Sequence, residues 1–225
     1  MYSLPIPLYF TNSVTVTFAT NAVPGAVVYY TTDGSEPASQ AYTAPIKLTA
    51  NTVLRAQLRA PGRVPSRIVT ATYYSTPPGG VAVVSISTAP ANLYSAETGI
   101  YVEGAAGSEF RPNYQRDWER GAHIEFFEPD GSLGFSTDCG LKIHGSFSRG
   151  FAQRSLRVHF RDEYGTGELD YPVFPESTVQ RFDSLILRNF GNDWNIACMR
   201  DALGQALATE MGLDTQAWRP AHVFL

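Results

Sequence analysis

The sequence predicts a mainly β or α+β protein, with an N-terminal β-sandwich followed by a strand-rich region that contains one main helix. Three observations support this class. Short runs of alternating apolar and polar residues recur along the chain. Clusters of Gly, Pro, Asn and Asp separate these runs, as turn residues do between strands. Only one segment, residues 195–211, carries apolar residues at the three- and four-residue steps of a helix.

Composition limits the function classes. The chain has 225 residues, of which 44% are hydrophobic, so it can form one large domain or two small ones with a real core. Its net charge of −4 argues against a general binder of nucleic acid or of anionic membranes. No apolar run approaches the ~20 residues of a membrane span. Residues 1–10 also lack the basic and apolar parts of a secretory leader.

The sequence predicts that the first part of the chain is all-β. Strands are expected at residues 13–18, 27–31, 52–58 and 67–74. The strongest local motif is Tyr-Tyr-Thr-Thr-Asp-Gly-Ser-Glu-Pro at residues 29–37, in which Asp33 and Gly34 suit an Asx-type turn. Two interpretations stay open for this motif. It is either a hairpin corner or a sugar-facing loop whose tyrosines serve as stacking platforms.

A change in charge divides the chain near residue 76. Residues 1–76 have a net charge of +3, and residues 77–225 have a net charge of −7. The junction contains Pro77-Pro78-Gly79-Gly80, which is typical of a linker. We therefore expect two domains, residues 1–76 and residues 77–225.

The second part mixes strands with the helix at residues 195–211. Asp193 or Asn195 can cap the start of that helix, and Gly212 can close it. The expected strands are residues 81–87, 122–128, 139–144, 155–160, 184–188 and 221–225.

The stretch from residue 141 to residue 161 holds five basic residues and no acidic one. It reads as two strands flanking a loop with Gly145 and Gly150, whose backbone N–H groups could hold phosphate oxygens. Arginines in the stretch could add bidentate phosphate contacts. If the first strand alternates, Lys142 and His144 share one face. The alternative is a hairpin with a solvated, arginine-rich face.

A second polar corner follows the strand at residues 184–188. Arg188 and Asn189 end that strand, and Asp193 precedes the helix. Polar groups at such a corner suit an anionic ligand, because helix N-termini favour negative charge. The alternative is a simple helix cap with an Arg200–Asp201 surface pair.

Other candidate groups carry weaker signals. Cys139 and Cys198 lack the spacing of a zinc or redox motif, and both buried thiols and a disulfide stay open. His123 and His159 have no third ligand at metal spacing, so no metal site is expected. Glu125 and Glu128 could suggest a paired-carboxylate glycosidase, but strand residues three apart point to opposite faces.

Residues 8–74 resemble the chitobiase/β-hexosaminidase C-terminal-type module, a pattern shared with fibronectin-III-associated repeats. The resemblance is carried by the motif at residues 29–37, followed by Tyr-Thr-Ala-Pro-Ile at 42–46, Leu-Arg-Ala at 54–56 and Pro-Ser at 65–66. It implies an accessory immunoglobulin-like β-sandwich of the kind found beside catalytic domains of secreted bacterial proteins. It implies no catalysis by the module itself.

Residues 81–225 resemble the CotH-type kinase family, named for a spore-coat protein. The matching pieces occur in family order: Val-Ser-Ile-Ser-Thr at 84–88, Asn92-Leu93, Gly-Ile-Tyr-Val at 99–102, Ala-His-Ile-Glu-Phe-Phe at 122–127, Gly-Leu-Lys-Ile-His-Gly at 140–145, Arg-Ser-Leu-Arg at 154–157, Tyr164-Gly165, Leu187-Arg188 with Asp193, and Arg200-Asp201. The resemblance implies a kinase-like lobe that transfers phosphate from ATP to Ser or Thr of surface or spore-coat proteins, with Mg²⁺ or another divalent metal.

The residues of this chain that we expect to bind nucleotide follow from the basic stretch, the polar corner and the resemblance together. They are Lys142, Arg149, Arg154, Arg157, Arg188 and Asp193. The family usually has Lys before the serine equivalent to Ser155, whereas this chain has Arg154, whose planar fork is not equivalent to an ammonium. No catalytic residue can be assigned.

The family continues beyond the equivalent of residues 222–225 with a lobe that carries catalytic and metal-binding aspartates. Phosphoryl transfer depends on positioning and on metal and charge stabilisation. We therefore expect these 225 residues to be an inactive fragment, with no cofactor of its own, of a parent kinase that uses ATP and Mg²⁺. The alternative is a non-catalytic cell-surface or carbohydrate-binding module with a glycan partner. A bacterial extracellular or cell-surface location follows from the resemblance alone.

Overall fold

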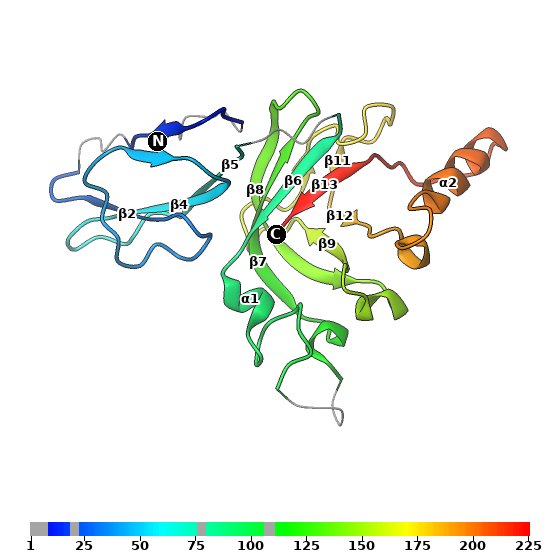
Figure 1. Ribbon diagram of the computed structural model, residues 1–225, viewed down its shortest axis with the longest axis horizontal. Coiled ribbons are helices and arrows are strands. Elements are labelled where there is room, and N and C mark those ends of the chain that lie inside the picture. Colours follow the sequence, from blue (N-terminus) through cyan, green and yellow to red (C-terminus); the bar gives the residue numbers. More distant parts are fainter. Residues whose placement is uncertain (1–8, 19–22, 76–79, 106–110) are drawn as a thin grey trace. The chain divides into compact units, whose positions relative to one another are not determined.

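Strands dominate the computed structural model, which describes residues 9–18, 23–75, 80–105 and 111–225 (Figure 1). The predicted mainly β, α+β class is confirmed. The described α-helices are α1 (Pro90–Tyr94) and α2 (Arg200–Glu210). Within the described ranges, neither helix has the length and apolarity needed to cross a membrane.

The chain forms two compact units. The first comprises residues 1–90, 123–136 and 222–225, and the second comprises residues 91–122 and 137–221. This division does not follow the charge boundary at residue 76. Residues 76–79 of the expected linker lie outside the described residues, so the domain boundaries at 1–76 and 77–225 stay a prediction.

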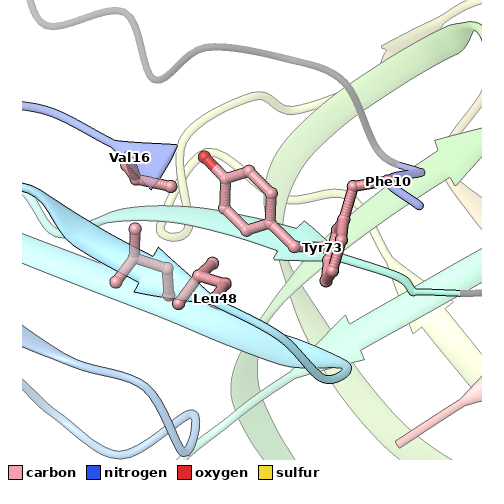
Figure 2. Packing of buried hydrophobic residues seen from close by; sticks show 5 residues of the cluster. Phe10, Val16, Leu48 and Tyr73 are labelled. Carbon is pink, nitrogen blue, oxygen red and sulfur yellow. The ribbon is translucent and has the colours of Figure 1, made fainter. Parts of the chain in front are cut away.

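A small β-sandwich makes up much of the first unit. One sheet pairs β1 (Val14–Val16) with β3 (Ile46–Leu48). The other has the order β2-β4-β5, formed by Val27–Thr31, Thr52–Arg59 and Val69–Tyr73. Apolar side chains from both sheets meet in one core, as Figure 2 shows. The buried members of this core are Phe10, Val16, Leu48, Leu54 and Tyr73.

The motif at residues 29–37 forms the predicted Asx-type turn. The Asp33 Oδ1 atom accepts hydrogen bonds from the backbone N–H and the hydroxyl of Ser35, at 3.0 and 2.6 Å. Gly34 has a φ of +78°, a conformation that L side chains rarely adopt. The turn therefore has the geometry of the hairpin-corner interpretation.

A buried carboxyl group lies in the same unit. Glu125 is on β7 (Glu119–Phe127), next to Ser85 on β6 (Ala82–Ser87). The hydroxyl of Thr72 donates to the Glu125 Oε2 atom at 2.6 Å and lies 2.8 Å from the Ser85 hydroxyl. Burial raises the pKa of Glu125, and the Thr72 hydrogen bond and the charge of His123 only partly oppose this.

We expect Glu125→Gln to stabilise the protein at neutral pH. Because the folded pKa of Glu125 lies above its unfolded value, the group favours folding most at low pH, and this contribution is lost as the pH rises toward the folded pKa. The side-chain amide of glutamine does not ionise, so the variant does not lose stability as the pH rises. Urea unfolding between pH 4 and 8 should show a growing advantage of Glu125→Gln over wild type as the pH rises. The exposed Glu97→Gln should show none, and equal pH profiles for all three proteins would refute this assignment.

A six-stranded sheet has the order β12-β9-β8-β7-β6-β13 (Figure 1). The additional strands are β8 (Leu133–His144), β9 (Ser155–His159), β12 (Ser184–Leu187) and β13 (Ala221–Phe224). Two further short strands, β10 (Leu169–Asp170) and β11 (Arg181–Phe182), pair with each other. Three 3₁₀ turns, η2 (Asn113–Gln115), η3 (Phe147–Gly150) and η4 (Gly191–Asp193), connect elements of the second unit.

The register of β8 against β9 is fixed by apolar residues. These strands are antiparallel, with Leu141 opposite Val158 and Ile143 opposite Leu156. All four side chains are buried. A slip of one residue would turn them to the other face, so their burial determines which residues the opposite face presents.

The main helix begins later than its sequence pattern predicts. The apolar period predicts a helix over residues 195–211, but α2 begins at Arg200. Cys198 has a φ of +54°, which interrupts a right-handed helix, and Asp193 accepts hydrogen bonds from backbone N–H groups that precede or begin α2. The predicted end is confirmed: Gly212 has a φ of +73°, and bonds from Gly212 to Thr209 and from Leu213 to Ala208 form a Schellman motif.

The apolar face of α2 is exposed. Leu203 and Leu207 are 53% and 57% exposed, and α2 contributes no buried side chain to the described structure. The helical period was therefore a correct guide to secondary structure, but not to burial in this chain.

Two leucine truncations should separate the core from this exposed face. Leu141→Ala removes a fully buried side chain and should lower the free energy of unfolding by about 2–5 kcal/mol. Leu203→Ala should change it by less than about 0.5 kcal/mol, as for an exposed site. Chemical denaturation measures both values. A loss at Leu203 as large as that at Leu141 would show that α2 is packed.

Candidate functional site

The second unit presents a row of basic residues on one face of β8 and β9. Lys142 on β8 lies directly opposite Arg157 on β9, and His144 lies opposite Ser155. These residues alternate with buried apolar ones, so Lys142 and His144 share a face, as the sequence predicted. On β12, Ile186 pairs with Arg157, and Arg188 follows two residues later, directly after the end of the strand.

His144 lies close enough to several basic residues for their charges to affect its titration. Burial lowers the pKa of His144, and the charges of Arg157, Arg188, Arg149 and Lys142 lower it further. Each cation disfavours a further positive charge on the imidazole. We call Lys142, Arg157 and Arg188, which lie on or directly after the strands next to His144, the cationic face.

A loop and a cleft adjoin the cationic face. The loop begins at Gly145, whose φ is +109°, and continues through η3. Arg149 fastens it, because its Nε atom donates to the Gly145 carbonyl at 2.7 Å and its Nη1 atom lies 3.3 Å from the carbonyls of Gln115 and Arg116. The cleft between the loop and the segment at 111–118 has a volume of about 530 Å³. It is lined by Arg111, Gln115, Arg116, Asp117, Trp118, Gly145, Ser146 and Arg149.

An ion pair joins the cleft to the cationic face. The Asp117 carboxylate, which lines the cleft, pairs with the Lys142 ammonium. The hydrogen bond and the charge of Lys142 lower the pKa of Asp117, and the charges of Arg149 and His159 add to this. The Asp117 carboxylate therefore links the cleft to Lys142 of the cationic face, and it is the one acidic residue in the lining of the cleft.

Arg154 has a different environment from the other predicted site residues. Its guanidinium lies 4.6 and 4.5 Å from the ring centroids of Tyr101 and Tyr114. Its Nε atom donates to the Arg149 carbonyl at 2.7 Å, and its backbone N–H donates to the Tyr101 hydroxyl at 3.0 Å. These contacts support the base of the loop, whereas a nucleotide contact by Arg154 stays a prediction.

The corner after β12 is held by a buried polar network. The Oδ1 atom of Asn189 accepts from the Ser155 hydroxyl at 2.7 Å and from the Gly191 N–H at 3.1 Å. Its Nδ2 atom donates to the Gln153 carbonyl at 2.5 Å. This network joins the start of β9 to the residues that follow β12, and so it holds the backbone next to Arg188 in place.

Arg188 and Asp193 both act on the start of α2. Arg188 pairs with Asp201 in the first turn. Asp193 accepts the backbone N–H groups of Met199 and Arg200, each at 2.9 Å, and these bonds lower its pKa. The helix cap therefore has direct contacts in its favour, although Arg200 pairs with Asp193 and Asp201 pairs with Arg188. A contact between Asp193 and nucleotide stays a prediction.

Sequence reasoning missed the segment at residues 111–118, which forms one wall of the cleft. The available signal was the concentration of Arg111, Arg116 and Arg120 within ten residues. The pairing of Asp117 with Lys142 had no such signal, because the two residues are 25 positions apart and come together only through the fold.

The remaining candidates do not form a second site. Groups of three or more His, Cys, Asp or Glu arranged to hold a metal ion are absent from the residues that the structure describes. Cys139 and Cys198 are free thiols, the first buried and the second exposed, so they form no disulfide. The Glu125 carboxylate is buried and accepts a hydrogen bond from Thr72, rather than pairing with Glu128.

The tyrosines of the sandwich make contacts within the protein. Arg59 lies over the ring of Tyr29, and Tyr30 and Tyr42 pack around Phe18. A glycan partner therefore stays a prediction.

Comparison with protein-family models identifies two segments of the chain. Residues 7–70 match the chitobiase/beta-hexosaminidase C-terminal domain, and residues 141–225 match the CotH kinase protein family. Comparisons with curated proteins and with solved structures give no match. The two resemblances and their order along the chain are confirmed, although the CotH match begins at residue 141 and not at residue 81. The loop at 145–150 and the predicted nucleotide-binding residues all lie within the CotH-matched segment, which is related to that kinase family.

The Asn189 network gives a prediction about the site's framework. Asn189→Ala leaves the Ser155 hydroxyl and the Gly191 N–H without their buried acceptor, which should lower the free energy of unfolding by about 1–3 kcal/mol. The exposed Asn192→Ala should cost less than about 0.5 kcal/mol. Denaturant titrations of both variants provide the measurement. Equal small effects would mean that the network does not hold the corner.

Proposed function

We propose that the cationic face and the adjoining cleft bind the phosphate groups of ATP, and that the chain is the nucleotide-binding part of a CotH-like protein kinase. One observation carries the proposal. Within the segment related to that kinase family, the pairing of β8 with β9 sets Lys142 directly opposite Arg157. Like charges opposite each other destabilise a sheet, and a bound polyanion relieves that repulsion.

The donors available on this surface suit phosphate. Arg157 has a buried Nε atom with no hydrogen-bond acceptor among the described residues, so its guanidinium keeps unused donor capacity. Guanidinium groups bind phosphate in a bidentate manner, and a lysine ammonium binds it as a point charge. Arg149 holds the loop whose backbone faces the cleft, which fits a positioning role for that residue.

The chemistry assigned to these residues is binding and orientation. Lys142 and Arg157 neutralise phosphate charge, and Arg188 contributes from its position directly after β12. Because the described residues offer no cluster of carboxylates or imidazoles for a metal, no residue is assigned to Mg²⁺. The acceptor, by this proposal, is Ser or Thr of a bacterial surface or spore-coat protein, and the sandwich acts as an accessory module.

The proposal is tested by the titration of His144. ATP bound at the cationic face brings negative charge close to the imidazole, so it should raise the pKa of His144 above its value in the free protein. NMR of labelled histidine, with and without ATP in the presence of a chelator, measures this change. The NMR signals of His123 serve as the internal control, and they should not change when ATP is added.

The ATP affinities of two variants provide a second test of the proposal. Arg157→Gln should weaken ATP binding about 10- to 100-fold, as for the loss of a charged hydrogen bond. Arg63→Gln, an exposed charge-matched control in the sandwich, should leave it unchanged. An unchanged pKa of His144 at saturating ATP, or equal affinities of the two variants, would refute the proposal.

A further inference from the structure

One carboxylate lies among the basic residues that line the cleft. Of the eight residues that line the cleft, three are arginines and only Asp117 is acidic. Besides lining the cleft with these arginines, Asp117 pairs with Lys142 of the cationic face. A phosphate group entering the cleft therefore meets the repulsive charge of Asp117, and this carboxylate already pairs with Lys142, one of the cations that the site offers.

The two partners differ in how firmly the fold holds them. The Asp117 side chain is 78% exposed, whereas the Lys142 side chain is only 22% exposed and projects from a strand paired on both sides. Exposed ion pairs contribute little free energy, so the carboxylate can leave its partner at small cost and become hydrated. The ammonium stays on the face beside Arg157, where its repulsion with that residue favours a new anion.

We infer that Asp117 is an internal counter-ion of the phosphate site, whose carboxylate pairs with Lys142 until an incoming phosphate group takes its place. The inference rests on the proposed phosphate site, and it adds a specificity element to that site. An anion must compete with a resident carboxylate for Lys142. Singly charged anions such as acetate compete poorly, and polyphosphates with several negative charges compete well, because they engage several cations at once.

The inference has a direct consequence for affinity. Removing the charge of Asp117 should tighten anion binding, because it frees Lys142 and removes a repulsive charge from the cleft. The free energy of an exposed ion pair corresponds to about a two- to fivefold change in a dissociation constant. An aspartate that instead helped to bind the ligand would give the opposite sign when replaced.

The experiment measures the affinity of the full chain for inorganic pyrophosphate by calorimetry, at fixed ionic strength and without divalent metal. Asp117→Asn should bind pyrophosphate about two- to fivefold more tightly than wild type, and Asp117→Ala should show the same direction. Asp214→Asn, an exposed variant with the same change in net charge outside the cleft, should bind like wild type. Thermal unfolding should show that all three variants fold.

A double-mutant cycle tests whether the effect passes through Lys142. In a Lys142→Gln background the counter-ion has no partner to release, so Asp117→Asn should lose most of its benefit. A full benefit in that background would mean that Asp117 acts only through its long-range field, and it would overturn the inference.

The remaining outcomes separate the two proposals. If wild type binds pyrophosphate and Asp117→Asn binds equally or more weakly, the counter-ion inference is wrong and the phosphate site stands. If neither wild type nor Asp117→Asn binds pyrophosphate, the proposed phosphate site is wrong, and the counter-ion inference falls with it.

Discussion

The register between β8 and β9 is the constraint on which the rest of the candidate site depends. Leu141, Ile143, Leu156 and Val158 are buried on one face, and their burial leaves Lys142 opposite Arg157 on the other. Hydrophobic burial is worth more than the repulsion between two partly solvated cations, so the apolar residues determine the register. The site is thus an electrostatic consequence of how the core packs.

The repulsion produced by this register is balanced in two ways. The Asp117 carboxylate pairs with Lys142, and His144 stays neutral more readily because its pKa is lowered by burial and by the surrounding cations. Around the face, Arg149 and Arg154 use backbone carbonyls and tyrosine rings to hold the loop that follows β8. The second unit therefore arranges its basic residues in two roles, with some positioned toward an anion and others positioned to support the loop.

The sequence was informative wherever local pattern decided the structure. Alternation along residues 139–144 placed Lys142 and His144 on one face, and Asp33 and Gly34 formed the turn that their chemistry predicts. Local pattern failed where a local backbone conformation or contacts with distant residues decided the structure. The helical period around Ile196 gave no warning that Asp193 and Cys198 delay the start of α2 to Arg200. Strand β3 and the first half of β8 were missed, since their short runs are ordered mainly by their partners. Asp117 carried no local sign of its contact with Lys142.

The central claim is that an anion binds where Lys142 and Arg157 face each other. A crystal structure of the protein with inorganic pyrophosphate tests it most directly. The account predicts pyrophosphate within hydrogen-bonding distance of Lys142 and Arg157, with the Asp117 carboxylate turned away from the ammonium. Pyrophosphate bound elsewhere while the Lys142–Asp117 pair stays intact, or no bound pyrophosphate at saturating concentration, would contradict it.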